Sequence, residues 1–136
     1  MGQSIIEVID AKGAFAGGII APGLMLGARS LSAAAARLSM IDLSAPTRVI
    51  GKSSRDAMRS GVVFGEVARI DGMLDMVLAE MRTGGAAGEE LAPIVINGDA
   101  AREMAGLLRH DLVPADTLTL RGLAELCRVN TQRRKV

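Results

Sequence analysis

Glycines beside long apolar stretches constrain the fold of this chain more than any other feature. One run, Gly17–Gly23, reads Gly-Gly-Ile-Ile-Ala-Pro-Gly, and a second glycine-bounded segment, Gly51–Gly61, follows farther along. Glycine has no Cβ, so it permits a neighbouring backbone or a ligand to approach closely. The two segments therefore predict parts of a built site rather than ordinary core, and they look like half of a larger structure.

Length and composition predict one soluble globular domain over residues 1–136. The chain is 49% hydrophobic with a formal net charge of +1, which supplies enough apolar material for a core. Its 16 lysines and arginines are balanced by 15 aspartates and glutamates, so no basic surface for nucleic acid is expected. No apolar run reaches the roughly 18 to 20 residues of a membrane span, and the N-terminus lacks the layout of a signal peptide. We therefore expect a cytoplasmic protein with neither nucleic acid nor membrane as a partner.

Hydrophobic periodicity predicts an α/β fold with an incomplete sheet. Ile and Val enrichment predicts a pair of antiparallel strands, and Ala, Leu, Met and Arg predict a helix after them. The expected elements are strands at 4–10 and 14–21, helices at 23–38 and 55–82, a strand at 93–96, a helix at 100–108, a short strand or bend at 111–114 and a helix at 118–129. They form a small mixed sheet with packed helices. A sheet this narrow normally has a further strand beside its first hairpin, and we expect that first strand to be missing.

The helix expected over residues 55–82 carries the clearest pattern. Ser53 and Asp56 resemble a capping box in which Asp replaces the usual Glu or Gln. Gly61 and Gly65 lie inside this helix, where each glycine costs up to about 1 kcal/mol relative to Ala, so we expect them to let another helix or a ligand approach. The apolar stripe of the helix comprises Met58, Val62, Val67, Ile70, Leu74, Val77 and Met81.

Several separate segments, in the same order and with similar spacing, resemble the second half of type III pantothenate kinases. Any one of them would be a weak match, but together they cover nearly the whole chain. The segments are Glu7–Gly13, Gly17–Gly23, Val49–Lys52, Ala57–Gly61 and Leu118–Leu123.

This resemblance implies an actin-like ATPase and sugar-kinase fold, built from two duplicated lobes with ATP in the cleft between them. The family phosphorylates pantothenate with ATP in the first step of coenzyme A synthesis, as dimers that use a divalent cation such as Mg²⁺ and often a monovalent one. The chain resembles only the second lobe, without its first strand and Asp-x-Gly-Thr phosphate loop. The first lobe, with the catalytic Asp in a Gly-Ala-Asp-Arg run, has no counterpart. No catalytic residue is therefore expected here, and the chain alone is expected to be inactive.

The resemblance places nucleotide contacts at two positions. Ser4 is the one residue near the first strand whose hydroxyl could still donate to a phosphate, since Ile5 and Ile6 stand where the family has hydroxyl residues. The turn Asn97-Gly98-Asp99 stands where the family has Thr-Gly-Gly. A carboxylate at Asp99 would repel a phosphate unless a cation lies between them. ATP binding at this turn is therefore expected to differ from that of the family.

The resemblance places substrate contacts at Ser32 and Ser54, and Gly17 and Gly18 could let the backbone approach the substrate. Ser32 stands where many members have a His, and Ser54 stands where the family has a Thr hydroxyl that holds pantothenate. A helix cap is an equally good interpretation of Ser54. Likewise, a bulge or tight strand packing explains the two glycines as well as an approaching ligand does.

Other motifs indicate no further chemistry. The segment Gly51–Ser53 imitates the end of a Walker loop, but Pro46 stands where that motif needs its first glycine. Asp71 and Asp75 are one helical turn apart and could bind a cation, although carboxylates on a solvated helix face are far commoner. No metal site is predicted.

The single histidine and the single cysteine have ordinary structural interpretations. His110 is expected at the edge of the core or in solvent, since a metal site needs further ligands. Cys127 has no partner for a disulfide and is expected to be a buried core thiol.

Two hypotheses follow for function. In the first, the chain is one component of a split pantothenate kinase and forms a heterodimer with a polypeptide that carries the first lobe. In the second, it is an inactive paralogue that acts as a binding or regulatory subunit, with the helices at 23–38 and 55–82 as its association surface. Both predict that the chain is not a monomer, because an unpaired sheet edge and apolar surface need a covering partner, either another copy or a first-lobe chain.

Overall fold

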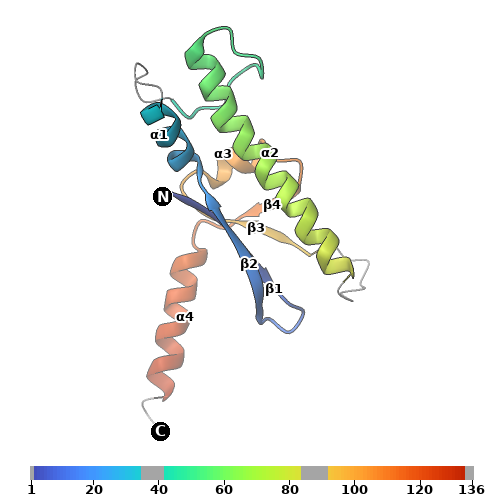
Figure 1. The fold of residues 1–136 in the computed structure, drawn as a ribbon. Helices are drawn as coiled ribbons and strands as arrows, with labels where there is room; N and C mark the ends of the chain where they lie inside the picture. Colours follow the sequence, from blue (N-terminus) through green and yellow to red (C-terminus); the bar gives the residue numbers. More distant parts are fainter. Residues whose placement is uncertain (1, 35–41, 84–91, 134–136) are drawn as a thin grey trace. The chain divides into compact units, whose positions relative to one another are not determined.

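A computed structural model of the chain describes residues 2–34, 42–83 and 92–133. The chain divides into two compact units, over residues 1–87 and 88–136, and each is described here by itself. The elements are β1 (Gln3–Ile9), β2 (Phe15–Pro22), α1 (Leu24–Ala34) and α2 (Ser54–Thr83) in the first unit, and β3 (Ile94–Ile96), α3 (Ala101–Ala105), β4 (Leu112–Pro114) and α4 (Leu118–Arg133) in the second (Figure 1). The expected α/β class is confirmed, and a single domain over 1–136 stays a prediction.

The expected antiparallel hairpin is confirmed. β1 pairs with β2 from Gln3 opposite Pro22 to Ile9 opposite Phe15. The turn is closed by Asp10, whose Oδ1 accepts hydrogen bonds from the backbone N–H groups of Lys12 and Ala14, both at 2.8 Å. Side-chain acceptors of this kind replace the backbone pairing that a turn interrupts.

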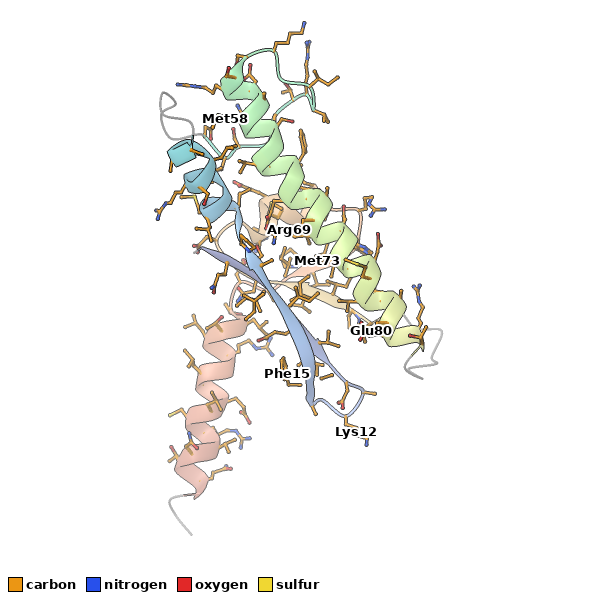
Figure 2. The ribbon with its side chains drawn as sticks, in the orientation of Figure 1. Lys12, Phe15, Met58, Arg69, Met73 and Glu80 are labelled. Atoms are coloured by element: carbon orange, nitrogen blue, oxygen red, sulfur yellow. The ribbon has the colours of Figure 1, made fainter. Side chains whose placement is uncertain are left out.

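The two faces of the hairpin differ in exposure. Ser4, Ile6 and Val8 alternate along β1 as half-buried residues, as the two-residue period of a strand requires. The opposite face is apolar too but exposed, and Figure 2 labels one of its members, Phe15, close to the turn. Its large members are Ile5, Ile9, Phe15 and Ile20. The hairpin therefore has apolar side chains on both faces.

The sheet differs from the expected single mixed sheet. In the described parts of the chain, β1 pairs only with β2, and β3 pairs only with β4, in parallel, with Ile94 opposite Leu112. The missing first strand stays a prediction. Of the two alternatives predicted for residues 111–114, a short strand or a bend, the structure has the strand, β4.

Helix α1 follows the Pro22-Gly23 turn, as expected, and residues 35–38 of its predicted range lie outside the described residues. The turn packs tightly on β1. The N–H of Gly23 donates to the carbonyl of Gly2 at 2.9 Å, and a Cβ on Gly23 would lie 2.9 Å from the carbonyl carbon of Gln3. This glycine is therefore required by a close backbone approach within the fold.

Helix α2 is confirmed almost to the residue, but its buried face differs in part from the predicted stripe. Leu74 is buried as predicted, whereas the most buried side chain is Val63 rather than Val62. Three of the five buried residues are polar; the buried set is Ser60, Val63, Glu66, Asp71 and Leu74. The solvated face expected for Asp71 is wrong, because it is only 4% exposed, while Asp75 is exposed as expected. The apolar pattern missed this face because polar residues interrupt it.

Ser53 caps α2, as the capping-box pattern predicts. Its Oγ accepts a hydrogen bond from the N–H of Asp56 at 3.1 Å and donates one to Asp56 Oδ2 at 2.7 Å. The alternative of Ser54 as the cap is wrong, since Ser54 is the first residue of the helix. Its side-chain hydroxyl therefore remains a candidate for another role.

Ser53→Ala should lower the free energy of unfolding by about 1 kcal/mol, because one N–H of the first turn loses its acceptor. Chemical denaturation followed by circular dichroism measures this change. Ser54→Ala is the matched control, and we expect it to change stability by less than about 0.5 kcal/mol. Equal losses in the two variants would contradict the assignment of the cap.

The loop before α2 is fastened to the helix by two side chains. Arg59 Nε donates to the carbonyl of Ser44 at 2.8 Å, and Ser60 Oγ donates to the carbonyl of Val49. Hydrogen bonds from the hydroxyl and N–H of Ser44, with a smaller contribution from the charge of Arg59, hold the pKa of Asp42 below its ordinary value. The hydrogen bonds of Arg59 and Ser60 tie residues 42–53 to the start of α2 within the first unit.

The second unit has a small core and one projecting helix. Ala101, Met104 and Leu108 are buried beside the short parallel strands. By contrast, α4 is exposed along almost its whole length, including Cys127. The predicted buried thiol is therefore wrong, because Cys127 is exposed on this helix. No helix in the described residues is both long and apolar enough to span a membrane.

Candidate functional site

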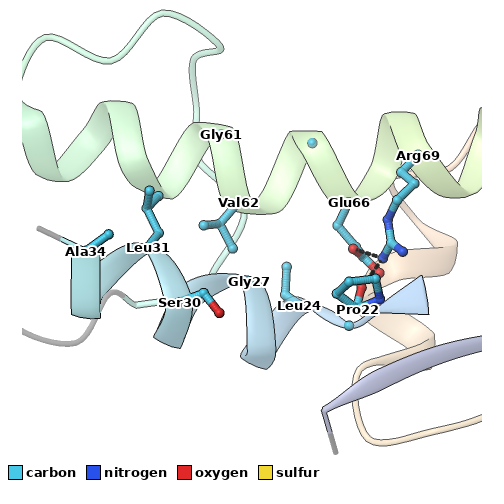
Figure 3. Close-up of a pocket in the computed structure, with 12 residues that line it drawn as sticks. Pro22, Leu24, Gly27, Ser30, Leu31, Ala34, Gly61, Val62, Glu66 and Arg69 are labelled. Carbon is cyan, nitrogen blue, oxygen red and sulfur yellow. Dashed lines mark hydrogen bonds and ion pairs between the residues drawn. The ribbon is translucent and has the colours of Figure 1, made fainter.

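A pocket of about 640 Å³ lies between α1 and α2 in the first unit (Figure 3). Its walls are mostly apolar and rich in small residues, with Gly27 on α1 and Gly61 and Gly65 on α2. The expected close approach of a helix at Gly61 and Gly65 is not found, because a Cβ on either would meet nothing within 4 Å. In this unit the glycines widen the pocket.

One end of the pocket is polar and centres on Glu66. This carboxylate is 8% exposed, and its Oε1 accepts a hydrogen bond from Ser4 Oγ at 2.7 Å. Its Oε2 pairs with Arg69, whose guanidinium also donates to the carbonyl of Pro22, as Figure 3 shows. Buried charges are tolerated only when they are paired and hydrogen-bonded, and Glu66 meets this condition. The cluster ties β1, the Pro22-Gly23 turn and α2 together.

Two polar atoms of the same unit have no hydrogen-bond partner among the described residues. They are Arg69 Nη1 and Ser32 Oγ, both of which are buried. A buried polar atom without a partner is costly, which makes these two atoms candidates for contact with a further group. Ser32 is one of the predicted substrate residues, and its role stays a prediction.

The strand geometry accounts for both predicted substrate glycines. Gly17 has φ of +136°, and the pairing shifts register beside it, between Val8 and Ile9, so the chain forms a bulge here. A Cβ on Gly18 would lie 2.4 Å from the carbonyl oxygen of Ile6. Bulge and strand packing, the structural alternatives, are thus both present. A ligand contact at either glycine stays a prediction.

The predicted nucleotide residues fall in different units. Ser4 lies in the first, where its hydroxyl is directed to Glu66. The turn Asn97–Asp99 lies in the second, after β3, where Asn97 Nδ2 donates to Thr119 Oγ1 at 3.0 Å and Gly98 adopts φ of +132°. The structure therefore gives Ser4 and Asn97 hydrogen-bond partners, each within its own unit, and a nucleotide contact at either residue stays a prediction.

Metal ligands are not clustered in the part of the chain that the structure describes. No group of three or more His, Cys, Asp or Glu side chains lies close enough to hold an ion there. His110 is half-buried. Of its two expected placements, the edge of the core and solvent, this agrees with the first.

Sequence reasoning missed Glu66 and Arg69 as residues of interest. Neither belongs to a motif, and the apolar stripe of α2 was traced without them. A signal was present, since Glu66 falls four residues after Val62, a member of the predicted stripe, and therefore close to the same helix face. An acidic residue on a buried face demands a partner, which in this fold is supplied by Ser4 and Arg69.

Comparison with known proteins identifies the family. The model of the type III pantothenate kinase family matches residues 4–76, more than half of the chain. The type III pantothenate kinase of Rhodospirillum centenum is 39% identical over 128 residues, which are 93% of this chain and 48% of that protein. That of Deinococcus radiodurans is 39% identical over 120 residues, 88% of this chain and 43% of that protein. The chain thus spans about half the length of the curated relatives it matches.

A solved structure shares the fold. A Campylobacter jejuni protein described as a Baf family transcriptional activator superposes with a TM-score of 0.55 at 16% identity, over 96% of this chain and 55% of that chain. At this identity the likeness concerns the fold alone, and again about half of the longer protein is matched. With relatives at this level of identity along nearly its whole length, the chain belongs to the type III pantothenate kinase family.

Proposed function

We propose that this chain is the second lobe of a pantothenate kinase of the actin-like ATPase and sugar-kinase fold, active only when another polypeptide supplies the first lobe. The reaction would transfer a phosphoryl group from ATP to pantothenate, in coenzyme A synthesis in the cytoplasm. One observation carries the proposal: nearly the whole chain matches kinases of which it spans about half.

The described residues support the proposal that a second polypeptide completes the site. Phosphoryl transfer requires a base near the acceptor hydroxyl and cations around the transferred group. The described part of the chain offers no carboxylate cluster for a cation, and the hydroxyl of Ser4 is directed to Glu66. These residues do not by themselves fit ATP and Mg²⁺. The metal, the catalytic Asp and any monovalent cation would be held with the other lobe.

What this chain would supply is a scaffold and part of the substrate wall. The exposed hydroxyl of Ser54 at the start of α2 and the buried, unpartnered Oγ of Ser32 on α1 are its two candidate contacts to pantothenate. Both lie in the first unit. Each is a proposal that the reconstituted enzyme can test.

The proposal is tested by a coupled assay of ADP release with ATP, Mg²⁺ and pantothenate. The chain is assayed alone and with the half of the Rhodospirillum centenum kinase that it does not match. We expect no turnover from either polypeptide alone and pantothenate-dependent turnover from the mixture. Omission of pantothenate from the mixture is the control for unrelated ATPase activity. A stable complex that neither turns over nor binds ATP by calorimetry would sink the kinase proposal.

A second candidate function, an inactive binding or regulatory subunit, is favoured by one observation. The carboxylate of Glu66 accepts the hydrogen bond of Ser4, the only hydroxyl expected to reach a phosphate, and a negative charge there opposes phosphate binding. For this function, the complex forms but ATP binding and turnover are both missing. The assay above therefore separates the two candidates.

A further inference from the structure

The start of helix α1 is held by hydrogen bonds from two directions. The N–H of Gly23 donates to the carbonyl of Gly2 at 2.9 Å, which ties the turn before α1 to the residue that precedes β1. The carbonyl of Pro22 accepts a hydrogen bond from the guanidinium of Arg69, which ties the same turn to α2. Figure 3 shows this second contact at one end of the pocket. The direction in which α1 leaves the turn therefore depends on both contacts.

Farther along, the pocket separates parts of α1 and α2. Gly27 on α1 and Gly61 and Gly65 on α2 line it, and a Cβ on any of the three would meet nothing within 4 Å. Leu31 of α1 also lines the pocket and is 39% exposed. Packing holds two helices in one geometry only where their atoms touch. The polar contacts at the turn therefore matter more for the angle between these two helices than they would in a filled interface.

Arg69 reaches the turn through a single nitrogen. Its Nη2 donates both to Glu66 Oε2 and to the carbonyl of Pro22, while its Nη1 has no hydrogen-bond partner among the described residues. Glu66 lies one turn earlier on α2, and its other oxygen accepts the hydrogen bond of Ser4 at 2.7 Å. A long side chain that is paired in this way has already lost rotamer freedom. Glu66 therefore orients Arg69, and Arg69 holds the turn.

We propose that Arg69, oriented by Glu66, is a positioning residue for the pantothenate wall. It fixes the angle of α1 and so places Ser32 on α1 relative to Ser54 on α2. This inference rests on the proposed function, and in it neither Arg69 nor Glu66 touches the substrate. Ser32 lies nine residues after Gly23, about 14 Å along a helix, so a rotation of about 5° at the turn moves it by about 1 Å. A misplacement of this size lowers a rate by up to about a hundredfold.

The kinetic test uses the mixture of this chain with the unmatched half of the Rhodospirillum centenum kinase. Arg69→Gln keeps a donor for Glu66 but is too short for the turn, and we expect it to raise the KM for pantothenate at least about tenfold while the KM for ATP stays within about twofold. Arg69→Lys should keep the KM for pantothenate within about threefold of the parent value, because one ammonium can donate to both acceptors that Nη2 serves. Leu74→Ala, which removes a buried side chain of α2 outside the pocket, is the control for lost stability and should leave this KM within about twofold.

A distance measurement tests the position of α1 without any activity. Spin labels are attached at Ala33→Cys on α1 and Met76→Cys on α2, both exposed positions, in a chain whose own cysteine is removed by Cys127→Ser. Pulsed electron paramagnetic resonance measures the label separation in the chain alone. We expect Arg69→Gln to shift or broaden the distribution of distances by at least about 1 Å, since the helix amplifies a small rotation at the turn, and Arg69→Lys to leave it unchanged. If Arg69→Gln does not fold, the double variant Glu66→Gln, Arg69→Met takes its place in both tests with the same expectations, because it leaves no charge of the pair uncompensated.

Each other outcome rejects a stated part of the proposal. Unchanged label distances reject the control of α1 by Arg69, whatever the kinetics show. An unchanged KM for pantothenate in an active mixture rejects the link to the substrate wall and leaves the kinase function intact. An equal rise in this KM for Leu74→Ala assigns the effect to lost stability and rejects the positioning role. Altered distances in a chain whose mixture has no pantothenate-dependent turnover reject the kinase function and leave the control of α1 by Arg69 intact.

Discussion

Glu66→Ala should lower the free energy of unfolding by about 2 to 3 kcal/mol, one of the largest losses expected from a single substitution in this chain. The carboxylate is buried and accepts hydrogen bonds from both Ser4 and Arg69. Its removal leaves a guanidinium without its counter-charge. Because the side chain of Arg69 is 24% exposed, water screens part of this loss, and the expected value lies below that for a fully buried pair.

The double variant Glu66→Leu, Arg69→Leu measures the net contribution of the ion pair to stability, without the cost of leaving one member unpaired. Replacing both members by apolar residues of similar size removes the desolvation cost along with the attraction, so we expect a loss of about 1 kcal/mol or less. Glu80→Ala, at an exposed position of the same helix, is the control and should change stability by less than about 0.5 kcal/mol. Denaturation with urea measures all three. If Glu66→Ala and Glu80→Ala lowered the free energy of unfolding equally, the buried cluster around Glu66 would not stabilise the fold.

Local patterns predicted the elements of the first unit well. The hairpin, helix α2 and its cap at Ser53 were all identified from residues close together in the sequence. Alternation in β1, the Ser53 and Asp56 spacing and the good helix formers of α1 act within a few residues. Such signals are visible in one sequence because the interactions that they report are local.

Burial of polar and reactive side chains could not be predicted in the same way. Ser4 and Glu66 are 62 residues apart, and only the packing of β1 against α2 makes one the partner of the other. The lack of a disulfide partner and the helical pattern predict a buried thiol at Cys127, but the structure places this residue at the surface. Hydrophobic periodicity shows that a face is apolar and does not show what lies on it.

The candidate site was predictable only to the level of the family. The resemblance found the segments around Gly17, Ser32 and Ser54, which the family model also matches. It could not show that a side chain at Gly18 would collide with the carbonyl oxygen of Ile6. Nor could it show that Asn97 donates a hydrogen bond to Thr119. Residues that serve the fold and residues that serve a ligand have the same identities in the sequence, and only their contacts separate them.

Gly51→Ala should lower the free energy of unfolding about as much as Glu66→Ala does. The reason here is a collision with backbone atoms and not the loss of a charge. A Cβ on Gly51 would lie 2.3 Å from the nitrogen of Ala57 and 2.5 Å from the carbonyl carbon of Asp56. These are backbone atoms of the first turn of α2, so no side chain can rotate to relieve the contact. The loop must move away from the helix start, where the N–H of Ala57 donates to the carbonyl of Ser53 at 2.8 Å.

We expect Gly51→Ala to lower the free energy of unfolding by about 3 kcal/mol, from overpacking together with loss of the cap at Ser53. Hydrogen exchange at the N–H of Ala57 should accelerate along with it. Gly72→Ala makes the same chemical change inside α2, where a Cβ meets nothing within 4 Å, and should stabilise the protein by up to about 1 kcal/mol. Opposite signs for the two substitutions would show that the close approach at Gly51, and not the loss of a glycine as such, decides the outcome. A Gly51→Ala variant as stable as the parent would mean that the loop does not rest on the helix start in solution.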